Sequence, residues 1–296
     1  MGPASDMTNM SNTTDLKGLV PAGAQIENLA GGFGFLEGPV WTNREGGYLI
    51  FSDIPRHELK RWSERDEVTT FRAPSHNNGN TRDAQGTLLT AEHDGRRVSR
   101  TTADGTVEVV VERYEGKCFN SPNDLVVKTD GTIWFTDPHY GLPKGGEGRE
   151  LDKNYVFRFD PKAGGLTALV DDFDMPNGLC FSPDEKRLYI ADSGKPHHIR
   201  VFDVRDDGTI GGGRVFCTLD VGIPDGIRCD TEGRVWSSAG DGIHIFATDG
   251  SLIGKIVTPD APGRFDPSKV GPEVPANLCF GGPDWSDLYI TACTSL

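Results

Sequence analysis

Six acidic or amide residues occupy equivalent places in six similar short segments of this chain. They are Glu37, Asn78, Asn123, Asn177, Asp225 and Asn277. Their side chains offer only carboxylate and amide oxygens, which suit a hard divalent cation such as Ca²⁺ or Mg²⁺. The two carboxylates, of Glu37 and Asp225, would balance the charge of one such ion. If the fold brings these residues together, we expect a cation site.

Turn formation is the simpler explanation for any one of these residues, because P-N-G and P-D-G are common turn sequences. It explains six aligned occurrences poorly, and Glu37 is not a favoured turn residue. A buried Glu and Asp without a positive partner would be costly. No Lys or Arg stands at any of the six positions. A bound cation is therefore the expected source of the missing positive charge.

The six positions, here called the anchors, also reveal a repeat. They are separated by 41, 45, 54, 48 and 52 residues, close to the period of about 40–50 residues of four-stranded propeller blades. Each anchor precedes a short apolar strand, a turn and a second strand rich in β-branched or aromatic residues. The repeat predicts an all-β fold, a six-bladed β-propeller. Its innermost strands would bring the anchors around one central channel.

Further strands complete most of the predicted blades. Period-2 segments start at His57, Arg96, Tyr155, Ile199 and Gly242, and fourth strands start at Glu67, Val107, Leu166, Val215 and Leu252. The sixth blade has only two strands before Leu296. We expect four-stranded antiparallel blades, with an N-terminal strand, AQIENLA from Ala24, closing the last blade. Residues 26–296 would form this single domain, after a polar leader or tag at residues 1–25.

Composition narrows the classes of partner. The 296 residues carry a formal charge of −14 without a basic stripe, which disfavours nucleic acid. No apolar run is long enough to span a membrane, and residues 1–25 lack the apolar core of a signal peptide. We therefore expect no nucleic-acid or membrane partner, a cytoplasmic location, and a monomer or weak homodimer.

The segments EGPVW, SPND, MPNG and PDG, with AEHDGRRVSR and LCFGGPD, resemble the SMP-30/gluconolactonase (regucalcin-like) family. The resemblance runs from about Ile26 to near the C-terminus. It implies one divalent cation, commonly calcium, held by Glu37, Asn123, Asn177 and Asp225, with Mg²⁺, Mn²⁺ and Zn²⁺ as alternatives. It also implies hydrolysis of a small sugar lactone such as D-glucono-1,5-lactone, with Asp225 as catalytic acid/base.

A cation in the channel would polarise the lactone carbonyl while Asp225 takes a proton from the attacking water. Asp225 acting directly as nucleophile is an alternative. Loops between second and third strands should supply substrate contacts, and His93, His139 and Tyr140 are the candidates there. Asn78, an anchor outside the family's ligand set, is a further candidate for binding the sugar or a water.

Two other functions are compatible with the same pattern. One is a calcium-dependent phosphotriesterase-like hydrolase, which would use a similar ring of ligands on a phosphorus centre. The other is a non-enzymatic ligand-binding propeller. A protein-binding propeller of the WD40 type is disfavoured, because its W-D endings are missing and the polar ring would have no role.

Overall fold

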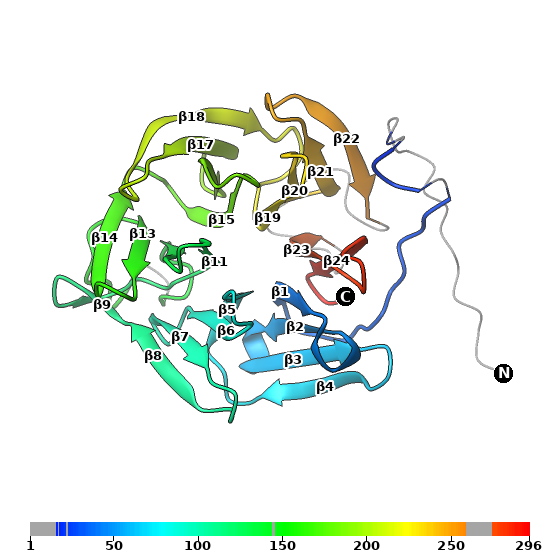
Figure 1. Cartoon of the computed structure of the whole chain (residues 1–296), viewed down its shortest axis with the longest axis horizontal. Helices are drawn as coiled ribbons and strands as arrows, with labels where there is room; N and C mark the ends of the chain where they lie inside the picture. Colours follow the sequence, from blue (N-terminus) through cyan, green and yellow to red (C-terminus); the bar gives the residue numbers. More distant parts are fainter. Residues whose placement is uncertain (1–15, 17, 22, 144–145, 259–273) are drawn as a thin grey trace.

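The computed structural model describes residues 16, 18–21, 23–143, 146–258 and 274–296. Six antiparallel sheets follow one another in chain order around a central axis, and the first strand of each sheet is the innermost (Figure 1). We name these sheets blades 1 to 6. The fold is an all-β propeller, as the repeat predicts.

Five blades have four strands each. Blade 1 contains β1 (Leu36–Thr42), β2 (Tyr48–Asp53), β3 (Glu58–Ser63) and β4 (Glu67–Arg72). Blade 2 contains β5 (Asn77–Arg82), β6 (Leu88–Glu92), β7 (Arg97–Thr101) and β8 (Val107–Val111). Blade 3 contains β11 (Leu125–Val127), β12 (Ile133–Asp137), β13 (Tyr155–Asp160) and β14 (Gly165–Val170). Blade 4 contains β15 (Pro176–Phe181), β16 (Arg187–Asp192), β17 (His198–Val204) and β18 (Ile210–Thr218). Blade 5 contains β19 (Ile227–Cys229), β20 (Val235–Ala239), β21 (Gly242–Phe246) and β22 (Leu252–Val257).

The remaining elements are short. Blade 6 consists of β23 (Pro275–Gly281) and β24 (Asp287–Ala292). A separate two-stranded ribbon joins β9 (Arg113–Tyr114) to β10 (Lys117–Cys118). The helical elements of the described residues are two 3₁₀ turns, Arg44–Gly46 and Ile54–Arg56. In this part of the chain no helix has the length and apolar character needed to cross a bilayer.

The third and fourth strands predicted for blades 1 to 5 are confirmed, because each predicted segment pairs in the expected order. The prediction of six four-stranded blades is wrong for blade 6, in which the described residues form two strands.

The predicted closing strand from Ala24 is also wrong as a regular strand, since residues 24–30 have no strand pairing. The ring closes through a smaller contact. Gly31 forms an isolated antiparallel bridge with Ser295, and the backbone N–H of Leu29 donates to the Leu296 carbonyl at 2.8 Å. The Leu296 N–H in turn donates to the Ala30 carbonyl at 2.8 Å. The N-terminal segment therefore pairs with the last residues of the sequence instead of lengthening β24.

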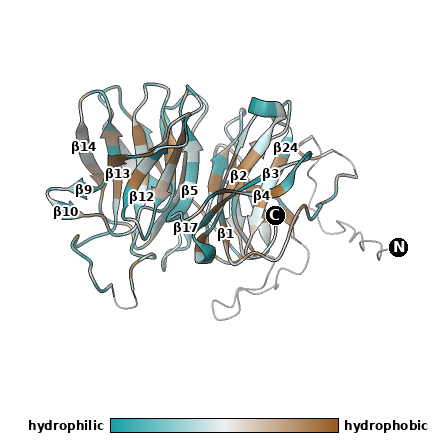
Figure 2. Cartoon of the chain, turned by 90° about the horizontal axis from the view of Figure 1, so that it is seen from below, coloured by the Kyte–Doolittle hydropathy of each residue, from teal (hydrophilic) through white to brown (hydrophobic). Residues whose placement is uncertain are grey.

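Hydrophobic clusters fill the spaces between neighbouring blades. Each of the six interfaces has its own cluster of buried side chains, including the interface between blades 6 and 1. There Trp41 stacks on Tyr289 with ring centroids 5.1 Å apart. Hydrophobic residues gather in the strands, whereas the loops at the two ends are mostly hydrophilic (Figure 2). Leu16 is buried against the cluster of blades 5 and 6, although it precedes the predicted domain boundary at residue 26. That boundary remains a prediction.

Neighbouring inner strands touch directly at the axis, backbone against backbone. The Gly79 N–H donates to the Asn123 carbonyl at 2.7 Å, and the Gly178 N–H donates to the Asp225 carbonyl at 3.0 Å. These glycines directly follow anchors. A Cβ at Gly178 would lie 2.3 Å from the Asp225 carbonyl oxygen, well inside van der Waals contact. Where the next blade approaches this closely, the residue after the anchor is therefore a glycine. These glycines make room for the neighbouring backbone as well as forming turns.

Replacing Gly178 by Ala should separate blades 4 and 5 at the axis. We expect a loss of about 1–3 kcal/mol in the free energy of unfolding, the usual cost of overpacking. Gly165→Ala in β14 is the matched control, since a Cβ there meets nothing within 4 Å. Urea unfolding monitored by tryptophan fluorescence measures both variants. Equal midpoints for the two variants would contradict the role given to Gly178.

Candidate functional site

The six anchors lie where regular pairing between the first and second strands is interrupted. Asn123 and Asp225 stand two residues before β11 and β19 begin. In the other four blades a register shift lies at or beside the anchor. These shifts fall between Glu37 and Val40, Asn77 and Asn80, Pro176 and Leu179, and Pro275 and Asn277. Such irregularities redirect side chains away from the normal alternation of a strand. We infer that they turn the anchors toward the axis.

A second set of carboxylates, missed in the sequence, holds the loops that lead into the anchors. Asp137, at the end of β12, accepts the backbone N–H groups of Asn120 and Ser121, each at 2.9 Å. Asp192 and Asp53 do the same for the loops before β15 and β1. The sequence did contain a pattern that could have revealed these carboxylates, because three of the repeated hairpins end in Asp.

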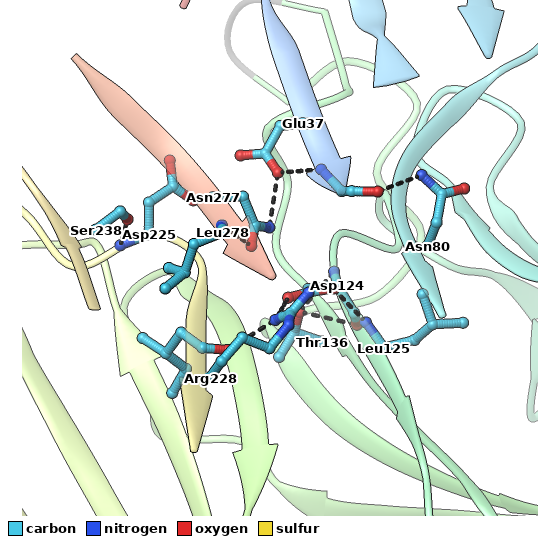
Figure 3. A network of polar contacts seen from close by, with 12 residues as sticks. Glu37, Asn80, Asp124, Leu125, Thr136, Asp225, Arg228, Ser238, Asn277 and Leu278 are labelled. Carbon is cyan, nitrogen blue, oxygen red and sulfur yellow. Dashed lines mark hydrogen bonds and ion pairs between the residues drawn. The ribbon is translucent and has the colours of Figure 1, made fainter. Parts of the chain in front are cut away.

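Glu37 is buried, with 4% of its surface exposed. Its Oε2 atom accepts hydrogen bonds from the Gly38 N–H at 2.8 Å and from the Asn277 amide at 2.9 Å (Figure 3). Burial nevertheless raises the pKa of Glu37 to about 7, and these two hydrogen bonds only partly oppose the shift. The protein itself therefore stabilises the ionised carboxylate incompletely.

Asp225 borders the same channel. Burial raises its pKa well above the ordinary value, and the negative charges of Glu37 and Asp124 raise it further. A hydrogen bond with the Asn177 side chain acts in the opposite direction. Two carboxylates, each disfavoured as an anion, thus lie close enough to interact.

These donors fit a divalent cation. The candidate set of Glu37, Asn123, Asn177 and Asp225 contains only oxygen ligands, and a positive ion would reverse the destabilisation of both carboxylates. The negative charge of Asp225 interacts with that of Glu37, and the Asp225 side chain forms a hydrogen bond with Asn177. Asn123 is buried just before β11. Asn277, the sixth anchor, acts as a hydrogen-bond donor to Glu37. This donor role separates Asn277 from the candidate ligands.

Below the ring lies an ion pair that the sequence did not reveal. Arg228 is three residues after the anchor of blade 5, and its Nη1 atom lies 3.3 Å from Asp124 Oδ2 of blade 3 (Figure 3). Asp124 is 1% exposed at its side chain. None of the six anchors is cationic, as the sequence shows. Arg228, however, brings a positive charge close to them. Arg228 compensates Asp124 and also lowers the pKa of Glu37 slightly.

The predicted substrate contacts reach the site to different degrees. Tyr140 is 45% exposed as a whole residue. Its hydroxyl lies near Ser193, Asn177 and Asp225, and burial of this group together with the charge of Asp225 raises its pKa. Asn78 is buried and its Oδ1 atom has no hydrogen-bond partner. Tyr140 therefore lies beside the anchors Asn177 and Asp225, and Asn78 is an anchor with an unsatisfied amide oxygen.

The two histidines lie farther along the rim. His93 packs against Gly141, the neighbour of Tyr140, because a Cβ on that glycine would come 2.3 Å from the imidazole. His139 Nδ1 is 3.0 Å from Asn154 Oδ1, a contact that fixes the loop. Sequence reasoning missed Asn77, which is buried beside Asn78 with both side-chain polar atoms unpartnered.

The fold and the site define a class: a β-propeller whose axis is ringed by buried carboxylate and amide side chains. The chain belongs to the SMP-30/gluconolactonase/LRE-like family, whose model matches residues 35–294. The family resemblance inferred from the motifs is confirmed.

Individual relatives cover most of the chain. A gluconolactonase of Zymomonas mobilis is 31% identical, over 94% of this chain and 81% of the relative. A pentonolactonase of Haloferax volcanii is 28% identical, over 86% of this chain and 80% of the relative. The solved structure of a gluconolactonase from Xanthomonas campestris is 36% identical, covers 90% of this chain and 87% of that one, and superposes with a TM-score of 0.80.

The raised pKa of Glu37 predicts a pH dependence for the metal-free protein. Its pKa rises from 4.5 to about 7 on folding, so the folded state binds more protons than the unfolded state between these values. The free energy of unfolding should therefore fall as pH rises from about 4.5 to 7. Thermal unfolding in EDTA should show a shallower fall for Glu37→Gln than for the wild type. Identical slopes would contradict the assignment.

The buried ion pair predicts a double-mutant result. Arg228→Met leaves Asp124 buried and unpaired, which should cost about 3–5 kcal/mol. Adding Asp124→Asn should recover much of this loss, because the uncompensated charge is then removed. Arg100→Met is the control, since the Arg100–Glu108 pair is solvent-exposed and should contribute less than about 1 kcal/mol. Additive effects of the two channel substitutions in urea unfolding would contradict the pairing.

Proposed function

We propose that this protein hydrolyses a sugar lactone, such as D-glucono-1,5-lactone, to the aldonic acid at the ring of anchors. The observation that carries the proposal is the interacting pair of buried carboxylates, Glu37 and Asp225, with the Tyr140 hydroxyl near Asp225. The family supports it, because the relatives include a gluconolactonase and a pentonolactonase.

Glu37, Asn123, Asn177 and Asp225 would hold one divalent cation. Calcium is the ion we propose, because all four side chains offer oxygen and none offers imidazole or thiolate. When bound, the ion supplies Lewis-acid polarisation of the lactone carbonyl and favours the ionised form of Asp225.

Asp225 is the proposed acid/base. Its carboxylate accepts a proton from the water that attacks the carbonyl carbon, and the proton then passes to the ring oxygen as the carbon–oxygen bond of the lactone breaks. Water is consumed and one hydroxy acid is formed, so no other reactant is needed. An alternative role for Asp225 is direct attack on the carbonyl carbon.

Tyr140 and Asn78 would orient the sugar. The Tyr140 hydroxyl has an ordinary pKa of about 10, which burial raises further. It therefore carries its proton at neutral pH and can donate it in a hydrogen bond to the substrate. The unpartnered Oδ1 atom of Asn78 is a matching acceptor for a sugar hydroxyl. His93 and His139 stay predicted contacts at the rim. Monomeric or weakly dimeric assembly and a cytoplasmic location also remain predictions.

Lactone hydrolysis followed by pH-stat tests this assignment. Asp225→Asn should lower kcat by about 10²–10⁴-fold, the usual contribution of a general acid–base group. EDTA should abolish activity and added Ca²⁺ should restore it. Asp249→Asn is the control, because Asp249 lies in an exposed turn.

The possible results separate the parts of the proposal. Full activity of Asp225→Asn would rule out the acid/base role. Full activity after chelation would rule out the cation. A wild type inactive on a panel of sugar lactones would remove lactone hydrolysis itself. Tyr140→Phe should raise KM more than it lowers kcat, since the tyrosine is assigned to binding.

A further inference from the structure

Three side chains from three separate segments meet on the rim of blades 1 and 2. His57 directly precedes β3, His76 directly precedes β5, and Asp94 lies in the turn between β6 and β7. Their potential ligand atoms all lie within 4.8 Å of one another. They are partly exposed, with 50%, 46% and 30% of the respective side chains accessible. The proposed lactone hydrolysis gives this cluster no role.

The distances suit a tetrahedral metal ion. His76 Nδ1 lies 3.0 Å and His57 Nδ1 lies 3.5 Å from the same atom, Asp94 Oδ2. Ligands about 2.0–2.1 Å from a tetrahedral zinc ion are about 3.3–3.4 Å from each other, and the two histidine-to-Asp94 separations lie on either side of this value. We propose that His57, His76 and Asp94 bind one Zn²⁺ ion. The fourth coordination position would face solvent.

A neighbouring histidine supplies an independent observation. His93 Nδ1 is buried and has no hydrogen-bond partner, yet it lies 3.9 Å from Asp94 Oδ1, the other oxygen of the carboxylate. An unpartnered imidazole nitrogen beside a carboxylate that already faces two other imidazoles is consistent with a positive ion at this cluster.

The backbone holds the three ligands in place without the ion. The Ser75 N–H donates to the His57 carbonyl at 2.7 Å, which joins the segments that carry the two histidines. Gly95 lets the Asp94 turn approach closely, because a Cβ there would lie 3.2 Å from the His76 Cβ. A site arranged in advance loses less conformational entropy when the ion binds.

This zinc site is distinct in chemistry from the ring of anchors. The ring offers only oxygen ligands, which favour calcium, whereas two imidazoles and one carboxylate favour zinc. The two sites share a rim, since His93 packs against Gly141 next to Tyr140.

Isothermal titration of the chelator-stripped full chain with Zn²⁺ tests the proposal. The test is made in the Glu37→Gln/Asp225→Asn background, which removes the carboxylates of the ring. We expect one zinc ion bound there. Adding His57→Asn and His76→Ala should weaken binding by at least about tenfold, equivalent to 1.4 kcal/mol. Substituting Co²⁺ should give visible absorption bands typical of tetrahedral coordination, which the added histidine substitutions should abolish.

His197→Asn with His198→Ala, added to the same background, is the matched control. It also removes two histidines, and His197, like His57, has a left-handed backbone that asparagine tolerates. The control should bind zinc as its parent does. Equal affinity in the cluster variant and the control would overturn the proposal, as would no zinc binding by the parent. Because binding is measured without the ring carboxylates, the result is independent of lactone hydrolysis.

Discussion

The close approach of neighbouring inner strands at the propeller axis is the constraint on which the rest of the structure depends. Backbone hydrogen bonds such as Gly178 N–H to the Asp225 carbonyl join one blade to the next, and at these contacts the residue after the anchor is a glycine because a Cβ would clash with the next blade. The anchors are thereby fixed on a narrow circle. Their polar groups cannot move apart to reach water, so their charges must be compensated inside the channel.

The channel contains two arrangements for compensating buried carboxylates. Asp124 faces Arg228, so this charge is balanced within the chain. Glu37 and Asp225 receive only partial help, from Asn277 and Asn177 respectively, and their pKa values stay raised. The charge of a carboxylate in an internal ion pair is already balanced. Carboxylates that are only partly compensated would instead be stabilised as anions if a cation bound beside them. This contrast is the basis for proposing a cation site at Glu37 and Asp225 and a structural ion pair at Asp124.

The sequence predicted the repeated elements well, because each depends on local pattern. The alternation in YVFRFD and the turns between strands act over a few residues, and they placed third and fourth strands correctly in five blades. Blade 6 was harder. Its completion depends on which distant segment reaches the edge of β24, and the structure uses Gly31 and Ser295 in an isolated bridge where the sequence suggested a full strand.

Sequence by itself determined the six anchors and their common register, because a repeated fold places equivalent residues at equivalent points around one axis. It also indicated the oxygen-donor chemistry of the site, since that follows from residue type. Only the tertiary structure decided the roles within the ring, such as Asn277 as a donor to Glu37. It alone revealed the pairing of Asp124 with Arg228 and the meeting of His57, His76 and Asp94. These groupings join different blades or segments, and their distances are set by blade packing, which no local pattern encodes.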